Sequence, residues 1–309
     1  MLGPHMRVVS LLSSATETVC ALGLEKYLVG ISHECDYPES IRHLPVVSKA
    51  RLNPLAPADL INSQVEDSIN RGLSLYQVDT ELLAKLKPDV ILTQDQCEVC
   101  AVSLKDVESA VCKVTGIQSK IVTLHPFALD DICKTFRQIG EALGAKEAAE
   151  DLVTRFWIQL NQVNARAGTH LKYRPKVLLL EWLDPLIVAG SWLPELCILA
   201  GADPLLISEP EHFKKVKFEE IKDLKPDRVI ILPCGWDLKR TQEEMNLPKI
   251  QKQLSQLGAP IYACDGNAFF NRPGPRIAES LEIFGAIIFP EKFPDLVKKH
   301  EGVHFARSG

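Results

Sequence analysis

Cysteine and histidine residues occur in two short segments with the spacing of metal ligands. His33 and Cys35 lie in the stretch Ser-His-Glu-Cys-Asp-Tyr-Pro at residues 32–38, and Cys97 and Cys100 form a Cys-x-x-Cys pair. Thiolate sulfur and imidazole nitrogen are the usual ligands of tetrahedral zinc, and the same groups hold iron–sulfur clusters or cap the metal of a bound chelate. We take all four residues as candidate metal ligands. Two other interpretations stay open: reduced cysteines at a helix start, and a thiol–disulfide redox pair.

Large aromatic side chains follow several apolar segments in the second half of the chain. These are Trp182, Trp192, Trp236 and Phe270. A planar ligand such as a tetrapyrrole needs flat walls, and indole rings provide a large contact area at little cost in rotamer entropy. The pattern predicts that these rings line a ligand site, Trp182 and Trp236 above all. The alternative is that at least one of them only fills the interface between the two halves.

Polar side chains complete the candidate site. Asn267 and Arg272 lie in a loop stiffened by Pro273 and Pro275, where a fixed guanidinium suits an amide, carboxylate or phosphate group of a ligand. The alternative is that Arg272 pairs with a nearby carboxylate of its own chain. Further polar candidates lie at the ends of expected strands: Ser14, Glu17, His33, Glu34, Gln94, Asp95 and Glu181. Ser14 also has the residue type of a helix N-cap.

The chain lacks the signatures of common catalytic sites. It has no glycine-rich phosphate turn, no Gly-x-Ser-x-Gly elbow and no His-Glu-x-x-His helix. The sequence therefore favours capture of a ligand over its turnover, and we expect a protein that is not an enzyme.

Alternating strand and helix patterns position these residues. In the first half we expect strands at residues 7–12, 28–32 and 90–93, with helices at 15–23 and 80–85. In the second half we expect strands at 176–181, 205–207 and 228–232, with helices at 193–201 and 218–224. Short apolar strands that alternate with helices form parallel sheets, and ligands bind at the carboxyl ends of such strands.

An internal repeat relates the two halves. The segment Leu-Lys-Pro-Asp at residues 86–89 recurs at residues 224–227, each time just before an apolar strand. The repeat predicts an α/β fold of two Rossmann-like lobes with parallel sheets. The first half is longer by about 40 residues, which we assign to a proline-containing excursion at 39–76 that runs over the surface.

A long helical segment separates the halves. Residues 146–166 carry one apolar stripe at three- and four-residue spacing, made of Ala149, Leu152, Val153, Phe156, Leu160 and Val163. A helix of this length is about 32 Å long and would join the lobes as one rigid connector. We expect an N-terminal lobe at 7–128, a connecting helical segment at 129–170, a C-terminal lobe at 171–290 and a tail at 291–309, with the ligand in the cleft between the lobes.

From about residue 7 to residue 290 the chain resembles the helical-backbone metal receptors. The likeness rests on the opening Ser-Leu-Leu-Ser-Ser-Ala-Thr-Glu at 10–17, the duplicated Leu-Lys-Pro-Asp segments and the long central helix. Members of this family are two-lobed binding proteins that deliver cobalamin, haem and ferric siderophores to ABC importers. The resemblance implies a non-enzymatic protein that holds a small metal-chelate ligand and has an ABC transporter permease as partner.

Three motifs are similar to the cobalamin-binding branch of that family. They are the 32–38 stretch, the Gln-Asp-x-Cys-x-x-Cys motif at 94–100 and the Asp-Gly-Asn-x-Phe-Phe-x-Arg-Pro-Gly-Pro-Arg block at 265–276. This likeness implies cobalamin or a related metal chelate as the ligand. Surface glutamates dock the transporter in this family, and Glu17 with Glu195 or Glu211 would be their counterparts here.

Composition and charge exclude several other classes. The 309 residues are 46% hydrophobic and 24% charged, typical of a folded globular protein. The net charge is −5 and the basic residues are not clustered, so we expect no nucleic-acid partner. The apolar runs are far shorter than the roughly 18 residues of a membrane span, so we expect no transmembrane segment.

The expected location follows from the cysteines and the N-terminus. Nine cysteines, an odd number spread over the chain, favour a reducing compartment over a disulfide framework. No export signal is recognisable after Arg7, so the sequence as it stands favours the cytoplasm, and the periplasm or cell surface if a signal peptide has been removed.

Two rival functions remain on these observations. One is a cytosolic enzyme or regulator that uses Cys35, Cys97 and Cys100 to hold zinc or an iron–sulfur cluster. The other is an adaptor whose excursion at 39–76 binds another protein.

Overall fold

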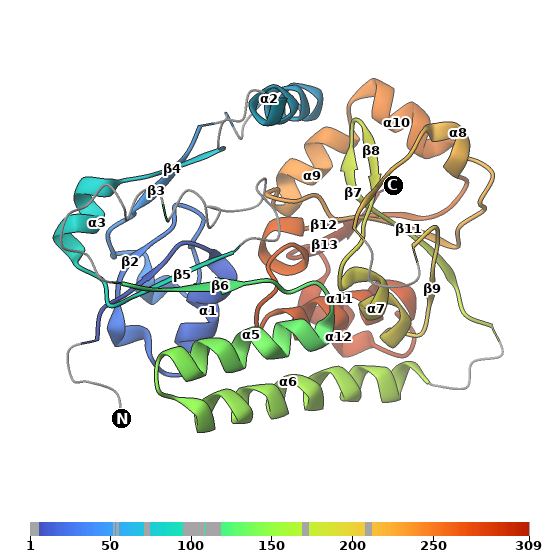
Figure 1. Cartoon of the computed structure of the whole chain (residues 1–309). Helices are drawn as coiled ribbons and strands as arrows, with labels where there is room; N and C mark the ends of the chain where they lie inside the picture. The colour runs from blue at the N-terminus through green and yellow to red at the C-terminus, as the bar shows by residue number, and fades with distance from the viewer. Residues whose placement is uncertain are drawn as a thin grey trace. The chain divides into compact units, whose positions relative to one another are not determined.

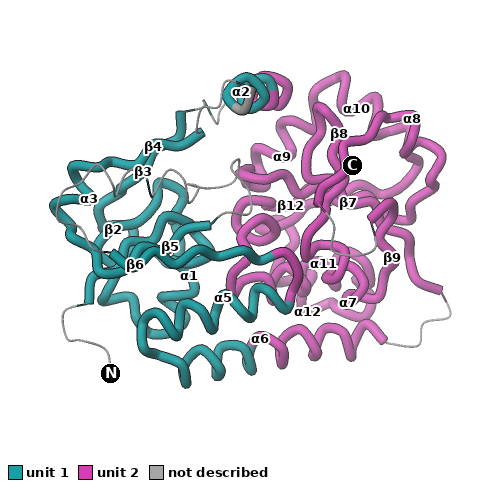
Figure 2. Tube along the Cα trace, in the orientation of Figure 1, with its two compact units in different colours: residues 1–56, 63–126, 130–155 teal, residues 57–62, 127–129, 156–309 magenta. Residues whose placement is uncertain are grey.

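The structure, a computed structural model, describes residues 6–51, 53, 56–70, 75–94, 108, 119–168, 173–207 and 212–308. The chain divides into two compact units (Figure 2). Unit 1 comprises residues 1–56, 63–126 and 130–155, and unit 2 comprises residues 57–62, 127–129 and 156–309. Two helices, α2 (Ala58–Asn70) and α6 (Lys146–Ala167), begin in one unit and end in the other.

Unit 1 is built on a four-stranded parallel sheet in the order β2-β1-β5-β6 (Figure 1). Its strands are β1 (Val8–Ser10), β2 (Leu28–Ile31), β5 (Val90–Gln94) and β6 (Lys120–Leu124). Helix α1 (Ser13–Ala21) follows β1 directly. Helix α3 (Thr80–Leu86) starts where the Asp79 carboxylate accepts the Leu82 N–H at 2.9 Å, and it leads into β5. The predicted elements of this half all appear, with ends within about two residues of the prediction.

The excursion at 39–76 has more regular structure than the sequence indicated. It contains the 3₁₀ turn η2 (Glu39–Ile41), strand β3 (Ser48–Ala50), helix α2 and the start of strand β4 (Tyr76–Val78). Strands β3 and β4 pair antiparallel, so the excursion leaves and returns through one short ribbon. The sequence analysis expected an excursion over the surface and did not predict these elements.

Unit 2 is built on a larger, mixed sheet in the order β10-β8-β7-β11-β12-β13, with β9 also paired to β7. Its parallel part is β9 (Asp203–Pro204), β7 (Lys176–Leu183), β11 (Arg228–Ile231) and β12 (Ile261–Cys264). The antiparallel strands are β8 (Leu186–Val188), β10 (Lys214–Lys215) and β13 (Phe305–Arg307). The sequence analysis expected an all-parallel sheet in this half, and that prediction is wrong for β8, β10 and β13.

Helices connect the strands of unit 2. They are α7 (Leu193–Leu199), α8 (Phe218–Ile221), α9 (Leu238–Met245), α10 (Pro248–Ser255), the π-helical turn η3 (Gly266–Phe270), α11 (Ile277–Ile288) and α12 (Pro294–His300). The strand predicted at 205–207 is wrong, because pairing with β7 covers Asp203 and Pro204 instead. Leu205 and Ile207 nevertheless pack on the core of the unit, and the Leu205 N–H donates to the Val177 carbonyl of β7 at 2.8 Å.

The Leu-Lys-Pro-Asp repeat has the same structure in both units. Lys87 and Lys225 both adopt left-handed backbone conformations, with φ of 42° and 50°. The carboxylate of Asp89 accepts the Arg7 N–H at 2.7 Å, and the carboxylate of Asp227 accepts the Lys176 N–H at 2.7 Å. In each unit the repeat thus ties the first strand to the strand beside it, which supports the internal duplication.

Helix α6 matches the predicted helix closely. The six residues of its predicted apolar stripe are all buried. Helix α5 (Leu129–Ala142) precedes it, and the Arg137 guanidinium on α5 forms two hydrogen bonds to the Glu150 carboxylate on α6, at 2.7 and 2.9 Å. The predicted fold class is confirmed: two α/β units with largely parallel sheet cores and one long helix that runs from one unit into the other. Within the described residues no helix has the length and apolar character to cross a bilayer.

Candidate functional site

In unit 2 two indole rings meet at the carboxyl ends of neighbouring parallel strands. Trp182 lies near the end of β7 and Trp236 lies in the loop after β11. Their ring centroids are 4.6 Å apart at an interplanar angle of 41°. Trp182 is partly exposed, and its Nε1–H donates to the carbonyl of Asp184 at 3.1 Å. Trp236 is only 3% exposed, so Trp182 is the ring that the pair presents where open α/β sheets bind their ligands.

A bulge in β7 lies beside this pair. The pairing of β7 with β8 shifts register between Leu180 and Trp182, so Glu181 is the extra residue. Bulges bend a strand and change the direction of side chains, and they are frequent near ligand sites. Glu181 is partly buried at this position.

Backbone packing fixes the two loops that follow β11 and β12. A Cβ atom on Gly266 would lie 2.1 Å from the carbonyl oxygen of Pro233, so only glycine fits there. The Asn267 N–H donates to the carbonyl of Trp236 at 3.0 Å. The amide of Asn271 donates to the carbonyl of Leu232 at 3.0 Å. These contacts therefore tie the position of the loop after β12 to the position of Trp236.

Asn267 and Arg272 contact each other within the second of these loops. The Arg272 Nη2 donates to the Asn267 Oδ1 at 3.1 Å, and Arg272 is buried. Asp265 starts the turn by accepting the Ala268 N–H at 2.8 Å, and burial raises the pKa of its carboxyl. Asn267 itself is partly exposed. The loop thus holds an amide in place by a buried guanidinium.

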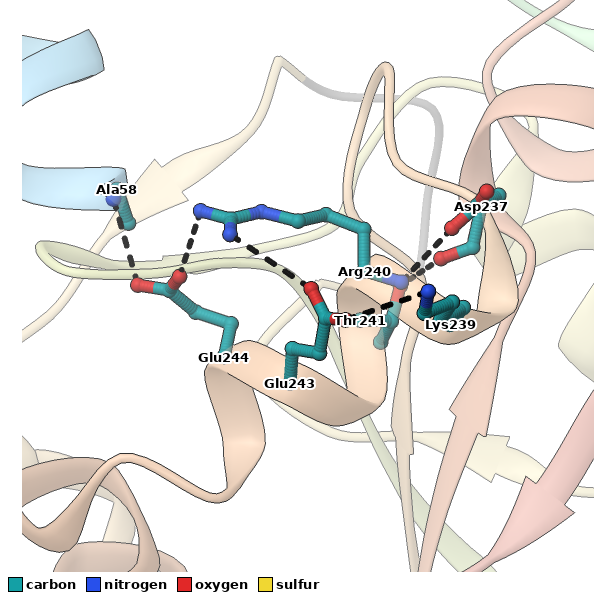
Figure 3. A network of polar contacts seen from close by, with 7 residues as sticks. All are labelled: Ala58, Asp237, Lys239, Arg240, Thr241, Glu243 and Glu244. Atoms are coloured by element: carbon teal, nitrogen blue, oxygen red, sulfur yellow. Dashed lines mark hydrogen bonds and ion pairs between the residues drawn. The ribbon is translucent and has the colours of Figure 1, made fainter. Parts of the chain in front are cut away.

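A cation lies over one indole ring, in a position that the sequence analysis missed. The Arg240 Cζ is 5.0 Å from the ring centroid of Trp236. Arg240 Nη2 also contacts the carboxylate of Glu244 at 3.0 Å, and Glu244 is only 4% exposed. The other oxygen of that carboxylate accepts the Ala58 N–H at 3.3 Å (Figure 3). Trp236 precedes the N-cap of α9 and is not on the helix, so helical spacing gave no signal for this contact.

The start of α9 holds Arg240. The Asp237 carboxylate accepts the Arg240 N–H at 2.7 Å, and the Thr241 hydroxyl donates to the Asp237 carbonyl at 2.9 Å (Figure 3). An N-cap one residue after Trp236 therefore sets the direction in which the helix and Arg240 leave the loop.

Trp192 and Phe270 lie in the interior of unit 2. Phe270 is fully buried, with its ring centroid 5.1 Å from that of Phe284 on α11. Trp192 is 6% exposed, and its Nε1–H donates to the carbonyl of Phe270 at 3.0 Å. These two rings pack within the unit, so we do not include them in the proposed ligand contacts.

In unit 1 the loop after β2 carries a partly exposed imidazole. His33 Nδ1 lies 2.8 Å from the Ser48 hydroxyl oxygen of β3, and the ring centroid lies 5.4 Å from that of Tyr76 of β4. Burial lowers the pKa of His33, so the ring is neutral at pH 7. The Tyr76 hydroxyl donates to Glu34 Oε1 at 3.4 Å. Ser48 and Tyr76 are contacts that the sequence analysis did not identify.

Other candidates of unit 1 are buried. Ser14, Glu17 and Gln94 are 4–6% exposed. The Ser14 carbonyl accepts the Thr18 hydroxyl, and no side-chain hydrogen bond caps the start of α1, so Ser14 is not the N-cap. With its carboxylate inside the unit, Glu17 does not present a surface contact for a transporter.

The described residues offer no group of three or more His, Cys, Asp or Glu side chains that could hold a metal ion. Cys35 is buried, with its Sγ 3.1 Å from the Thr16 hydroxyl. Cys97, Cys100 and Asp95 lie outside the described residues, as does Glu211. Glu195 accepts the Leu129 N–H at 2.8 Å, at the start of α5.

Taken separately, each unit has a group of described side chains of the kinds that contact metal chelates. Unit 2 combines an indole pair with a guanidinium and a fixed amide. Unit 1 combines a neutral imidazole with hydroxyl groups. Aromatic faces bind flat ligands, amide and guanidinium groups orient polar substituents, and neutral imidazole coordinates metals.

Comparison with known proteins gives a consistent result. The chain is 24% identical over 297 residues, 94% of its length, to the uncharacterized ABC transporter substrate-binding lipoprotein YvrC of Bacillus subtilis, of which it covers 82%. It is 22% identical to the vitamin B12-binding protein of Pectobacterium carotovorum, with 88% of this chain and 84% of that protein covered. The structure of a periplasmic haem-binding protein from Pseudomonas aeruginosa matches with a TM-score of 0.66 at 21% identity, covering 92% of this chain and 93% of that one.

A family model described as periplasmic binding protein matches residues 8–250, well over half of the chain. This match covers the sheet of unit 1, the strands of unit 2 up to β11 and the loop of Trp236. The chain therefore belongs to the periplasmic binding protein family.

Proposed function

We propose that this protein captures a planar metal chelate, cobalamin or a related corrinoid or haem, and does not transform it. The observation that carries the proposal is the Trp182–Trp236 pair at the carboxyl ends of β7 and β11, with the Arg240 guanidinium over Trp236. The two rings are tilted by 41° and Trp236 is 3% exposed, so we assign direct ligand contact to Trp182 and support of that ring to Trp236 and Arg240.

Polar groups of the same loops suit the rim of such a ligand. Corrin rings carry amide side chains and haem carries carboxylates, and an amide–guanidinium pair can bind both. Asn267 is partly exposed while Arg272 behind it is buried, so we assign direct contact to Asn267 and orientation of that amide to Arg272. Glu181, on the β7 bulge, is a further rim candidate.

The ligands named for similar proteins support this class of ligand. One relative is a vitamin B12-binding protein, and proteins with similar folds include haem-binding and vitamin B12-binding proteins. We rank cobalamin first because of the three motifs quoted from residues 32–38, 94–100 and 265–276. In unit 1, we assign metal contact to His33 and rim contact to Glu34.

Parallel calorimetric and visible-absorption titrations with cyanocobalamin, haemin and zinc chloride test the proposal. We expect uptake of one chelate per chain. Trp182→Ala and Trp236→Ala should each weaken it about tenfold or more, as expected for truncation of a buried aromatic contact. Trp157→Ala, on α6, is the matched control and should leave affinity unchanged. Stoichiometric zinc without chelate uptake would favour the metal-dependent alternative instead.

We also propose delivery to an ABC importer outside the cytoplasm. The cytoplasmic location expected above is not supported, because the matching family is described as periplasmic and one relative is a substrate-binding lipoprotein. Co-purification of the chelate-loaded protein with a membrane fraction that contains the cognate permease tests this proposal. Equal recovery of loaded protein from membranes without the permease would contradict it.

A further inference from the structure

The β3–β4 ribbon carries two side chains that contact the loop of His33. We infer that Ser48 and Tyr76 are positioning residues that hold His33 as the Nδ1–H tautomer and leave its Nε2 free to coordinate the metal of the captured chelate. The inference rests on the proposed function for its ligand, but the tautomer itself is a property of the free protein.

Ser48 makes the decisive contacts. Its hydroxyl oxygen lies 2.8 Å from His33 Nδ1 and also accepts the His33 backbone N–H at 3.2 Å. The one proton of this hydroxyl is donated to the Ser32 hydroxyl oxygen at 3.2 Å. With that proton directed to Ser32, the Ser48 oxygen accepts from the ring, and this arrangement favours a proton on Nδ1, from which the Ser32 hydroxyl oxygen lies 3.4 Å away.

Tyr76 supports the ring from a second side. Its ring centroid lies 5.4 Å from that of His33, with the planes tilted by 43°. Its hydroxyl donates to Glu34 Oε1 at 3.4 Å, which links the residue after His33 to the same ribbon. Ser48 and Tyr76 are both buried, at 6% and 8% exposure, so neither contact is an incidental surface contact.

The ribbon places both side chains on one face. Ser48 pairs with Val78 and Ala50 pairs with Tyr76, whereas Lys49 and Gln77 between them are exposed. Successive residues of a strand point to opposite faces, so one face of the ribbon is turned toward His33 and the other toward water. This argues against the adaptor interpretation, in which removal of residues 39–76 would leave ligand binding intact.

His33 Nε2 has no hydrogen-bond partner among the residues that the structure describes. Metal-binding histidines usually donate the hydrogen of their other ring nitrogen to a fixed acceptor, which sets the tautomer and the direction of the ring. Ser48 has this role here. With a corrinoid bound, His33 Nε2 would supply its lone pair to the metal in place of a water ligand, and no electron or proton would be transferred.

Nitrogen-15 NMR of the ligand-free protein at neutral pH tests the tautomer directly. We expect a pyrrole-like Nδ1 and a pyridine-like Nε2 for His33. Ser48→Ala should mix the tautomers, and Ser48→Thr, which keeps the hydroxyl, should restore the pattern. Lys49→Ala on the opposite face of β3 is the matched control. A protonated Nε2 in the wild-type protein would overturn the inference.

Aquocobalamin, whose axial water can be replaced, tests the consequence for the ligand. We expect its visible spectrum to shift on binding, and we expect the shift to be lost in His33→Ala while cyanocobalamin still binds. Ser48→Ala and Tyr76→Phe should weaken aquocobalamin binding by about 10- to 100-fold, the usual range for a residue that orients a metal ligand. Cyanocobalamin affinity should change much less.

The two proposals fail in different ways. If neither corrinoid nor haemin binds the wild-type protein, the proposed function fails, whatever the NMR result. If cyanocobalamin and aquocobalamin bind equally in wild type and in Ser48→Ala, with no spectral shift, the positioning role fails and the proposed function stands. Should Ser48→Ala prove unfolded, the nitrogen-15 pattern of the wild-type protein still decides the tautomer, and a protonated Nε2 there overturns the positioning role.

Discussion

Gly266 has the tightest steric requirement of the residues in the candidate site. Its backbone lies against the carbonyls of Leu232 and Pro233, so an added methyl group would force the two site loops apart. We expect Gly266→Ala to destabilise the protein by about 1–3 kcal/mol or more, and to lower chelate affinity. Urea unfolding and the titration described above measure the two effects.

Gly235→Ala is the control variant for Gly266→Ala. Gly235 lies in the same loop system with φ of +76°, but an added Cβ would meet nothing within 4 Å. Gly235→Ala should cost only the left-handed conformational strain, about 1–2 kcal/mol. Chelate affinity equal in Gly266→Ala and wild type would contradict the argument from loop coupling.

Protonation of His304 makes the stability of the protein depend on pH. The Nδ1 of His304 lies 2.8 Å from His300 Nδ1, and its ring packs on Phe269 with centroids 4.4 Å apart. Burial, then the charges of His300 and Lys299, lower the pKa of His304 from 6.5 to about 4. Because the unfolded chain binds the proton more readily, stability is fully present above about pH 6.5 and declines as the pH falls toward 4.

Thermal unfolding between pH 4 and pH 7 checks this expectation. His304→Asn should flatten the dependence of Tm on pH in this window, because the titrating group is gone. His43→Asn, at an exposed position, is the control and should leave the dependence as in wild type. An unchanged slope in His304→Asn would show that other groups are responsible.

Residue types predicted which side chains contact each other better than they predicted how deeply each side chain is buried. Trp182 and Trp236 were identified from position alone, and they do lie together. Trp236 is nevertheless buried, and so is Phe270, which η3 turns onto Phe284 of α11. The residue pattern did not indicate the direction in which η3 points its side chains. Ser48 has an ordinary residue type, and only the return of β3 beside His33 reveals its role.

At the scale of elements, periodicity predicted helices well because burial repeats along them. The predicted 146–166 helix is α6 to within one residue, and its stripe is buried. Short strands were less predictable. Leu205 and Ile207 pack on the core, while strand pairing with β7 covers only Asp203 and Pro204 and ends where the Leu205 N–H donates to the Val177 carbonyl. Excursion elements were missed because α2 has mixed polarity and β3 and β4 have only three residues each.

Phe156 tests the role of the α6 stripe. It is 2% exposed, so Phe156→Ala removes a buried ring and should destabilise the protein by about 3–5 kcal/mol. Ile158, two residues away on the same helix, is 51% exposed, and Ile158→Ala should change stability by less than about 0.5 kcal/mol. Denaturant unfolding of both variants measures the contrast. Similar losses would mean that the stripe does not carry the helix packing.

At the scale of the whole molecule, capture of a ligand must increase stability. A chelate that binds only the folded chain stabilises it by about 2.7 kcal/mol when its free concentration is 100 times the Kd. We expect Tm to rise with cyanocobalamin concentration in wild type, and to rise much less in Trp236→Ala at the same concentrations. Differential scanning calorimetry is the measurement. A constant Tm across saturating concentrations would contradict specific binding to the native state.

The pairing of β13 with β12 has a consequence for solubility. Ala306 pairs with Ala263, and the Ser308 N–H donates to the Ile261 carbonyl at 2.8 Å. Loss of the residues from 305 onward would leave one side of the apolar segment Ile-Tyr-Ala-Cys without backbone partners. A strand with unpaired backbone groups can form hydrogen bonds with the same strand of another molecule. Proteolytic trimming of the last few residues should thus convert a monodisperse sample into one that aggregates on storage.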